Sequence, residues 1–219
     1  MQQRWAQQHR GVRAAGQNEA AMPEEPRILG AEGSRVIVRS ATEFDLDAVL
    51  KLAQAVQLYP GMDTRNGFLV SALSRETYAA ALSYLERQKD AEHVVFLIAE
   101  SNGKVLGFLF GYNDVYASRR SGGRSEEDIA VRFQDSYYVL KQIATDLNDR
   151  QRGVARRLAE RFFSEVKCSF IFSAIVAEPE NLASCAFHRE MGFSPLFESI
   201  SRSASGETYR NQVWRRACL

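Results

Sequence analysis

The sequence of 219 residues predicts an α/β protein in which strands and helices alternate along most of the chain. Apolar residues recur with a period of two in some segments and at helical spacing in others. Residues 137–145 have the β-branched and aromatic content of a strand and run, through a loop with glycine, into a helical pattern beginning at Val154. A hydrophobic content of 45% is sufficient for one full core at this length.

The remaining elements are assigned from the same patterns, with Gly and Pro marking the breaks. Pro60-Gly61 ends the first helical pattern, and Ser101-Asn102-Gly103 is a hairpin turn sequence. The expected elements are a strand at 35–40, a helix starting at 42, a helix at 75–89, a hairpin of strands 93–100 and 104–112, the strand 137–145, a helix at 154–166, a strand at 169–176, a helix from 181, and closing strands near 194–201 and 207–215.

The loop at residues 150–155 reads Arg-Gln-Arg-Gly-Val-Ala, and we expect it to bind an anion. It opens a helix, so unpaired backbone N–H groups lie at the positive end of the helix dipole, where phosphate binds. Gly153 allows a bulky anion close to the backbone. Arginine suits phosphate because its planar fork of donors is always charged. The arginines nearby are Arg150, Arg152, Arg156, Arg157 and Arg161. The alternative is an ordinary solvated helix face that starts with a glycine.

A second motif extends from Asn181 to Phe193 and reads as a capped helix. Asn181 is a plausible N-cap and Gly192 a C-terminal stop. At about 100° per residue, Asn181 and His188 lie about 20° apart on one helix face and roughly 10 Å apart along the axis. The motif therefore presents one amide and one imidazole along a single edge.

Together, the two motifs resemble those of the GNAT superfamily of acyl-CoA-dependent N-acetyltransferases. The pyrophosphate loop of that family has Gln or Arg, then Gly three residues later, then Gly or Ala two residues after that. Its later helix has Asn, a Tyr or His seven residues on, and Gly-Phe at eleven and twelve. The matching residues are Arg150, Gly153 and Ala155 in the loop, and Asn181, His188, Gly192 and Phe193 in the helix. The resemblance covers about residues 35 to 215, and the His-containing version is similar to the phosphinothricin-type branch.

The resemblance implies a fold and a co-substrate. The fold is a mixed, strongly twisted central sheet of about seven strands with helices on both faces, and the co-substrate is acetyl-CoA, without a metal. Backbone groups of Ile143, Ala144 and Thr145 are expected to bond the pantetheine arm and polarise the thioester carbonyl. Asn181 is expected to bond the cofactor arm. The pyrophosphate loop comprises Arg150, Gln151, Arg152, Gly153, Val154, Ala155 and Arg156.

His188 is the candidate catalytic residue. The family usually protonates the departing CoA thiolate with a tyrosine, and His188 stands at the matching position. An imidazole with a pKa near 6.5 serves as acid or base near neutrality. The alternative is that His188 only lines the cofactor pocket. Phe187 has no proton to donate and does not replace it.

The acceptor amine must also lose a proton. A lysine-like amine with a pKa near 10.4 is neutral in only about one molecule in 2,500 at pH 7, whereas an α-amine with a pKa near 7.7 to 8.0 needs much less help. The candidate bases are Glu178, Asp146 and Tyr138. The candidate acceptor contacts, on the expected first helices and hairpin, are Tyr59, Asp63, Arg65 and Tyr112.

Composition excludes several other functional classes. A net charge of +1 disfavours a nonspecific nucleic-acid binder, and there is no apolar run long enough for a membrane span. The cysteines are odd in number and widely spaced, which indicates reduced thiols in the cytoplasm rather than a zinc site. A P-loop nucleotide-binding protein is disfavoured because the Gly-Lys-Ser/Thr ending is absent.

For three segments the sequence gives only an expected role or a choice between roles. Residues 1–34 are rich in Gln and Arg and are expected to form a mobile extension to a single domain at 35–219; a transit peptide, a mis-assigned start or a site-contacting extension are alternatives. Residues 113–135 are longer than the short turn of the family pattern and are either a solvated loop or a lid. The closing strands are expected, by family habit, to support a homodimer.

The sequence therefore predicts an N-acetyltransferase that transfers acetyl from acetyl-CoA to a primary amine of a small molecule or amino acid, by direct attack in a ternary complex. Acetylation of a protein N-terminus or lysine is the alternative within the same chemistry. The rival from another class is a non-catalytic acyl-CoA-binding regulatory module.

Overall fold

The structure, a computed structural model, describes residues 35–59, 61–87, 93–118, 128–130, 132–133, 135–149, 153–202 and 206–218. The N-terminal extension predicted for residues 1–34 lies outside the described residues. Residues 34–219 belong to one structural unit, to which everything below refers.

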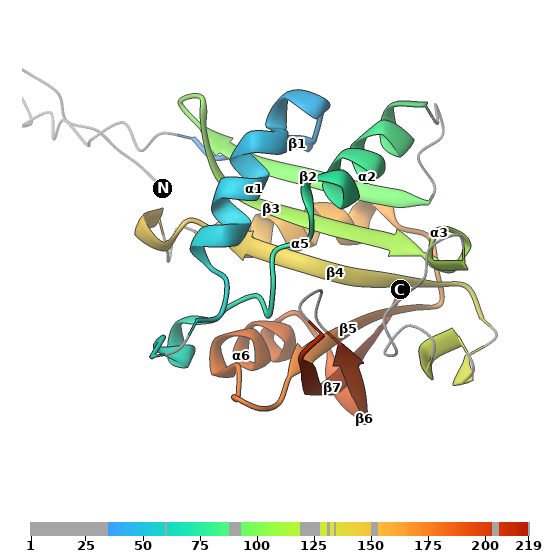
Figure 1. The fold of residues 1–219 in the computed structure, drawn as a ribbon. Helices are drawn as coiled ribbons and strands as arrows, with labels where there is room; N and C mark the ends of the chain where they lie inside the picture. The colour runs from blue at the N-terminus through green and yellow to red at the C-terminus, as the bar shows by residue number, and fades with distance from the viewer. Residues whose placement is uncertain are drawn as a thin grey trace, which may run out of the picture. The chain divides into compact units, whose positions relative to one another are not determined.

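A seven-stranded mixed sheet forms the centre of the fold, in the order β1-β2-β3-β4-β5-β7-β6 (Figure 1). All neighbouring strands are antiparallel except β4 and β5, which are parallel. The predicted fold class is thereby confirmed. The strands are β1 Ile37–Ser40, β2 Val94–Ser101, β3 Lys104–Asn113, β4 Tyr137–Thr145, β5 Phe170–Val176, β6 Ser194–Arg202 and β7 Thr208–Ala217.

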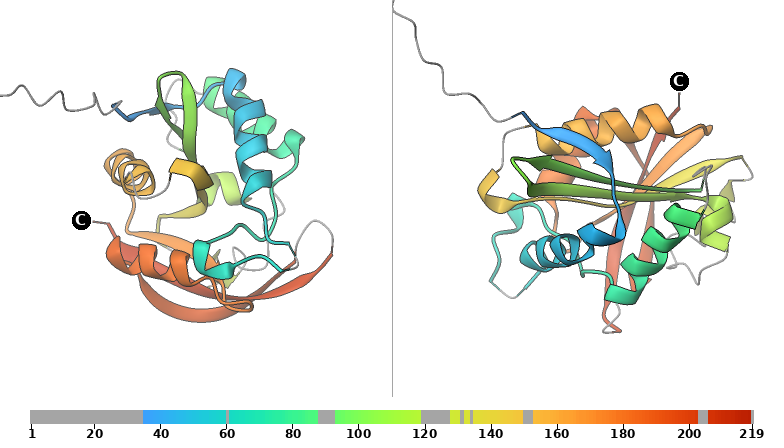
Figure 2. Two further views of the ribbon diagram at one scale, coloured as in Figure 1. Left: turned by 90° about the vertical axis from the view of Figure 1, so that its left-hand side faces the viewer. Right: turned by 90° about the horizontal axis from the view of Figure 1, so that it is seen from above.

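The two faces of the sheet are covered by different helices (Figure 2). Helices α1 and α2 pack on one face and α5 on the other, and each face has its own cluster of buried apolar side chains. The helices are α1 Leu46–Ala55, α2 Arg75–Arg87, α3 Asp114–Ser118, α5 Val154–Glu165 and α6 Leu182–Glu190, with short 3-10 turns η1 Glu43–Asp45, η2 Thr64–Asn66 and η3 Leu147–Asp149.

The predicted apolar stripe of α5 faces the core, since Val154, Leu158 and Phe162 are all buried. Two glycines of β3 permit this close packing. A Cβ on Gly107 would lie 2.9 Å from Val154 Cγ1, and one on Gly111 would lie 2.7 Å from Phe162 Cε2. Both distances are shorter than van der Waals contact, so a larger side chain at either position would push α5 off the sheet.

The predicted hairpin is also present. Asn102 and Gly103, between β2 and β3, have φ of 51° and 74°, the left-handed region that a tight hairpin turn requires. On its other edge β3 pairs with β4, and the register shifts because Phe110 faces Gln142 while Gly111 faces Leu140. Lys141 is thus the extra residue of a β-bulge in the middle of β4.

The parallel pairing between β4 and β5 is short. It joins Tyr137–Val139 to Phe170–Phe172 and stops there. Beyond this point β4 continues to Thr145, paired on its β3 side only. The two parallel strands therefore separate in their second halves and leave a row of β4 backbone groups facing the gap.

The long connection at residues 113–135 is only partly described. It begins with α3, and residues 128–130 and 132 are helical. Ile129 is buried, and Phe133 packs on Phe172 with ring centroids 4.8 Å apart. Residues 119–127 lie outside the described part, so the proposed lid remains a prediction.

β6 is an outer strand of the sheet and presents Leu196 and Ile200 to solvent. The homodimer expected through the closing strands stays a prediction. No helix in the described part of the chain has the length and apolar character of a membrane span.

Candidate active site

Two cavities meet where β4 and β5 separate. The larger has a volume of about 350 Å³ and the smaller of about 150 Å³. Both are walled by β4, by α6 and by the loop that precedes α2. The lining residues common to the two cavities are Phe68, Leu69, Ile143 and Ser184. This junction is the place where molecules bound in the two cavities would touch.

The smaller cavity contains most of the residues that were expected to bind the pantetheine arm. Ile143, Ala144 and Thr145, in the half of β4 that pairs with β3 only, line it together with Ala155 from the first turn of α5. From α6 come Ala183, Ser184 and Phe187. The cavity thus has a wall of strand backbone opposite a wall of small and apolar helix side chains.

Among the described residues, no side chain caps the start of α5. Its N-cap residue is Gly153, with φ of 69° and no side chain to satisfy the first N–H groups of the helix. A Cβ on Gly153 would meet nothing within 4 Å, so a side chain at this position would find open space. Uncapped N–H groups at an open helix end form an anion site. Arg150, Gln151 and Arg152 lie outside the described residues.

The side chains of Val154 and Arg156, two further residues of the predicted pyrophosphate loop, are both engaged within the protein. The side chain of Val154 is buried in the core beneath α5, so it can contribute to an anion site only through its backbone. Arg156 forms an ion pair with Glu190 at the end of α6. This pair links the two helices on either side of the smaller cavity.

The predicted N-cap role of Asn181 is confirmed. Its Oδ1 accepts a hydrogen bond from the backbone N–H of Ser184 at 3.2 Å, and its Nδ2 donates to the carbonyl of Phe68 at 2.9 Å. The residue is only 3% exposed and lines the larger cavity. Asn181 therefore fastens the loop before α2 to the start of α6.

His188 is buried, with 3% of its surface exposed, and both ring nitrogens have partners. Nδ1 lies 2.7 Å from the carbonyl oxygen of Ser184, and Nε2 lies 3.0 Å from the hydroxyl of Ser173. A carbonyl only accepts, so Nδ1 carries the proton of the neutral ring and Nε2 is the acceptor. Burial lowers the pKa of His188 to about 4, so the ring is neutral at physiological pH.

Ser173 follows directly after the last residue of β5 that pairs with β4. Its hydroxyl lies 3.2 Å from the carbonyl of Leu140, the first residue of β4 beyond the paired section. His188, Ser173 and Leu140 therefore form a chain of polar contacts at the point where the strands part. Sequence reasoning missed Ser173, because its importance depends on where the pairing stops.

The segment from Phe68 to Ser74 forms the wall of the larger cavity opposite the sheet. Side chains of several elements hold its backbone. Besides Asn181, Gln142 of β4 donates to the carbonyl of Ser71 at 3.1 Å. The Tyr78 hydroxyl donates to Gln142 Oε1 at 2.6 Å and accepts from the N–H of Leu73 at 3.4 Å. These contacts were not predicted, because Gln142 looked like an ordinary strand residue.

The charged residues lining the larger cavity are Lys141, on the β4 bulge, and Arg202, at the end of β6. Among the described lining residues there is no Asp or Glu. The three candidate bases lie elsewhere: Glu178 pairs with Arg210, Asp146 pairs with Lys104, and Tyr138 is buried beside α5. None of the three lines either cavity.

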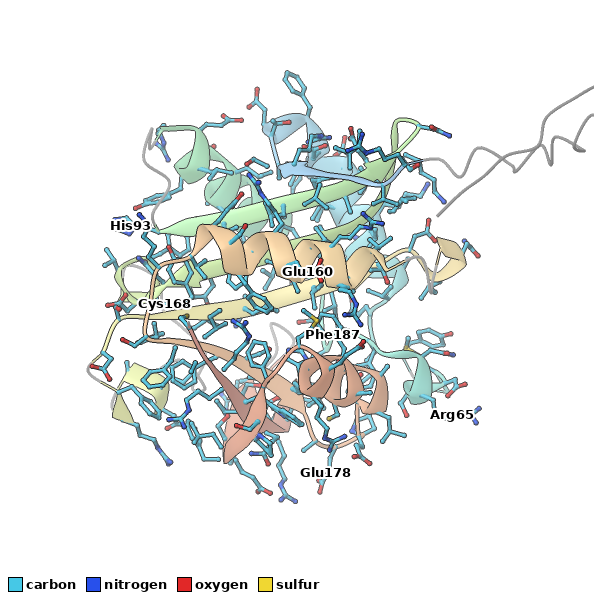
Figure 3. The ribbon with its side chains drawn as sticks, turned by 180° about the vertical axis from the view of Figure 1, so that it is seen from behind. Arg65, His93, Glu160, Cys168, Glu178 and Phe187 are labelled. Atoms are coloured by element: carbon cyan, nitrogen blue, oxygen red, sulfur yellow. The ribbon has the colours of Figure 1, made fainter. Side chains whose placement is uncertain are left out.

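The predicted acceptor contacts do not line the cavities either. Asp63 and Arg65 pair with each other at the surface, and Tyr59 is exposed. Tyr112 is buried in an aromatic cluster with Phe110. In Figure 3 the side chains of Arg65 and Glu178 extend outward from the ribbon. Within the described part of the chain, no group of three or more His, Cys, Asp or Glu is arranged to hold a metal.

The fold is similar to those of several solved structures. The ribosomal-protein-alanine N-acetyltransferase of Brucella melitensis is 21% identical with a TM-score of 0.56, and the match covers 83% of this chain and 99% of that protein. NAA60 of Arabidopsis thaliana, solved with a bisubstrate analogue, is 11% identical with a TM-score of 0.59 over 84% and 98% of the two chains. At these identities the likeness shows a shared fold.

A third similar structure, yncA of Salmonella typhimurium, was solved with its cofactor acetyl-CoA; it is 16% identical with a TM-score of 0.55 over 84% and 94% of the two chains. None of the curated proteins matches this chain. The model of the acetyltransferase (GNAT) family matches residues 62–193, which is more than half of the sequence and includes both motifs. This chain therefore belongs to the GNAT family of acetyltransferases, which use acetyl-CoA as co-substrate.

Proposed function

We propose that this protein transfers the acetyl group of acetyl-CoA to the primary amine of a small molecule or amino acid, by direct attack in a ternary complex. The observation that carries the proposal is the junction of two cavities at the separation of β4 and β5. One cavity suits the thioester arm and the other suits the acceptor, and the shared lining brings the reacting atoms together.

The residues around the smaller cavity fit acetyl-CoA. The backbone groups of Ile143 to Thr145 that point away from β3 offer hydrogen bonds to an amide-containing arm and fixed dipoles for the thioester carbonyl. The open, uncapped start of α5 at Gly153 offers N–H groups to the pyrophosphate. Asn181 lines the larger cavity rather than the smaller one, but it retains one amide N–H beyond its bond to Phe68 and is proposed to bond the cofactor arm where the two cavities meet.

The larger cavity favours a small acceptor. Its volume of about 350 Å³ lies at the lower end of the range for small-molecule sites, roughly 300 to 1,000 Å³. Lys141 and Arg202 line it, and no carboxylate is found among its described lining residues. This charge favours an acceptor that carries a carboxylate beside its amine, such as an amino acid, over a polyamine. The His188 version of the motif supports a proposed assignment to the phosphinothricin-type branch.

A second candidate is acetylation of a protein N-terminus. The described lining of the larger cavity offers no carboxylate base, which suits an α-amine with a pKa near 7.7 to 8.0 better than a lysine amine. The Brucella protein of similar fold is a ribosomal-protein-alanine N-acetyltransferase. The cavity is small, so only the first one or two residues of a peptide would be enclosed.

The test is release of free thiol from acetyl-CoA in the presence of acceptor panels: amino acids, the same compounds as carboxamides, polyamines, and short peptides. A direct CoA titration of the purified protein accompanies it. We expect turnover with an amino acid and weaker turnover with its carboxamide. Preferred turnover of peptides would instead support the N-terminal candidate. CoA binding with background turnover on every panel would support the non-catalytic binding module.

A further inference from the structure

We propose that Ser184 is a catalytic residue of this acetyl transfer, passing a proton from the acceptor amine to the departing sulfur, and that His188 is a positioning residue that holds it. This inference rests on the proposed function and names a group that the sequence motif did not. It also means that His188 is not the acid that protonates the CoA thiolate.

The first argument is position. Ser184 belongs to the lining shared by both cavities, and its companions there, Phe68, Leu69 and Ile143, have apolar side chains. Ser184 is therefore the shared residue whose side chain carries an exchangeable proton. It lies three residues after Asn181 and four before His188, on the helix face that both of those residues turn toward the larger cavity. On a helix, the group presented to such a neighbouring space is the side chain.

The second argument is availability. The Ser184 backbone is held at both ends, because its N–H donates to Asn181 Oδ1 and its carbonyl accepts from His188 Nδ1. Its hydroxyl makes no hydrogen bond within the part of the chain that the structure describes. The residue is thus fixed in place while its proton-carrying group is left for a bound molecule.

The third argument excludes His188 as the proton donor. The proton of neutral His188 is on Nδ1 and is engaged by the Ser184 carbonyl, while Nε2 accepts from Ser173. The ring therefore has no proton directed at the cavity. Phe187, on the preceding position of α6, has none at all. What His188 does instead is donate to the carbonyl of Ser184 and accept from the hydroxyl of Ser173, which lies where β4 and β5 separate.

The proposed step starts from the neutral amine, which has already lost its first proton to solvent, and from there it balances without an external acid or base. The amine lone pair forms the C–N bond to the acetyl carbon, and the C–S bond breaks with its electron pair remaining on sulfur. The Ser184 hydroxyl gives its proton to that sulfur and takes the surplus proton from nitrogen. The products are an amide and a thiol, and the hydroxyl is regenerated. A hydroxyl suits this exchange because it both donates and accepts.

The experiment compares Ser184→Ala, Ser184→Thr and Ser184→Cys in the full chain, using the best acceptor from the panel. Ser83→Ala, on the exposed face of α2, is the matched control. Loss of one proton-transfer group lowers kcat by about 100-fold or more. We expect that loss in the Ala variant, with unchanged CoA affinity by titration and an unchanged melting temperature. Thr or Cys should recover turnover, and Ser83→Ala should match the original protein.

Several results would overturn the inference. Full turnover by Ser184→Ala in a protein that acetylates its acceptor would remove Ser184 from the chemistry and leave the proposed function standing. Weakened CoA binding in the Ala variant would make Ser184 a binding residue. Failure of both Thr and Cys to exceed Ala would show that the hydroxyl's proton is not what matters. Absence of turnover by the original protein on every panel would overturn the proposed function, and this step with it.

Discussion

Helices α5 and α6 both begin beside the smaller cavity, yet their first turns are completed in opposite ways. α5 starts at Gly153, which has a left-handed backbone and no side chain to cap the helix. α6 starts at Asn181, whose amide oxygen accepts the N–H of Ser184. The first helix end leaves its donors for an anion, whereas the second uses its cap residue to fix neighbouring parts of the protein.

The difference separates cofactor binding from structural support, although both sequence motifs were interpreted as cofactor-binding. We propose that the start of α5 is a binding surface for the pyrophosphate of CoA. The capped end of α6 connects parts of the fold. Asn181 bonds the Phe68 carbonyl in the loop before α2, and His188 bonds Ser173 of the sheet. Changes at the first end should therefore act on cofactor affinity, and changes at the second on stability and geometry.

The largest expected effect is that of Gly153→Glu on CoA affinity. A unit charge about 4 Å from a phosphate costs about 4 kcal/mol at an effective dielectric of about 20, and screening by solvent reduces this. We expect CoA affinity to fall by at least about 100-fold. Isothermal titration measures the affinity, and circular dichroism checks that the fold persists.

The matched control for that variant is Gly153→Asn. Asparagine tolerates a positive φ and adds no charge, and the space around the Cβ is open. Its CoA affinity should stay near that of the original protein. Equal affinities for the Glu variant and the original protein would contradict an anion site at the start of α5, and the contrast between the helix ends would fail.

The next effect concerns His188 and pH. Its pKa is lowered to about 4 in the folded protein, against about 6.5 when unfolded. Below pH 6.5 the unfolded chain gains a proton that the folded protein does not, so stability is lost as pH falls from about 6.5 toward 4. The full difference corresponds to about 3 kcal/mol, of which about 2 kcal/mol is lost by pH 5.

Urea unfolding at pH 7.5 and pH 5, for the original protein and for His188→Gln, measures this loss. The variant has no titrating group at the position, so its stability should fall less over the same interval. Other acid-sensitive groups, such as Asp45 with its pKa lowered by its partner Arg39, are common to both proteins and cancel. The same dependence in both would show that His188 titrates as an accessible group, available for acid catalysis after all.

A smaller effect is expected at Asn181. Asn181→Ala removes the cap of α6, at about 1 kcal/mol, and leaves the Phe68 carbonyl without its donor, at about 1 kcal/mol more. Asn181→Ser keeps a cap oxygen but is too short to reach Phe68, so about half of the loss should be recovered. Chemical denaturation gives both values. Unchanged stability together with a large loss of CoA affinity would show that the proposed bond to the cofactor arm, and not the cap, is the main role of Asn181, and the contrast between the two helix ends would fail.

The sequence predicted the helices, strands and turns of this protein well because the signals for them are local. The turn at Asn102-Gly103, the stripe of Val154, Leu158 and Phe162, and the cap at Asn181 each depend on residues within one or two turns of chain. Each predicted strand and helix was found with shifts of a few residues at its ends. The mixed sheet of about seven strands came from the resemblance rather than from these patterns, and the order of its strands was not predicted.

The candidate site was less predictable because it depends on where pairing stops. Nothing in residues 137–145 shows that the partner strand leaves after Val139, and without that fact Ser173 is one serine among many. The ring state of His188 depends on burial and on the Ser184 carbonyl, which come from the packing of α6. The bases suggested by proximity in sequence, Glu178 and Asp146, proved to be engaged in ion pairs away from the cavities.

The wall formed by residues 68–74 has a consequence for how such a protein changes its substrate. Its main chain is fastened by side chains that belong to other elements, namely Asn181, Gln142 and Tyr78. The side chains of Val70 and Ser71 belong to neither apolar cluster, whereas Leu69, Ala72 and Leu73 pack against the core. Substitutions at Val70 or Ser71 can therefore reshape the larger cavity while the backbone keeps its course, so a new specificity can arise by single steps without an intervening loss of the fold.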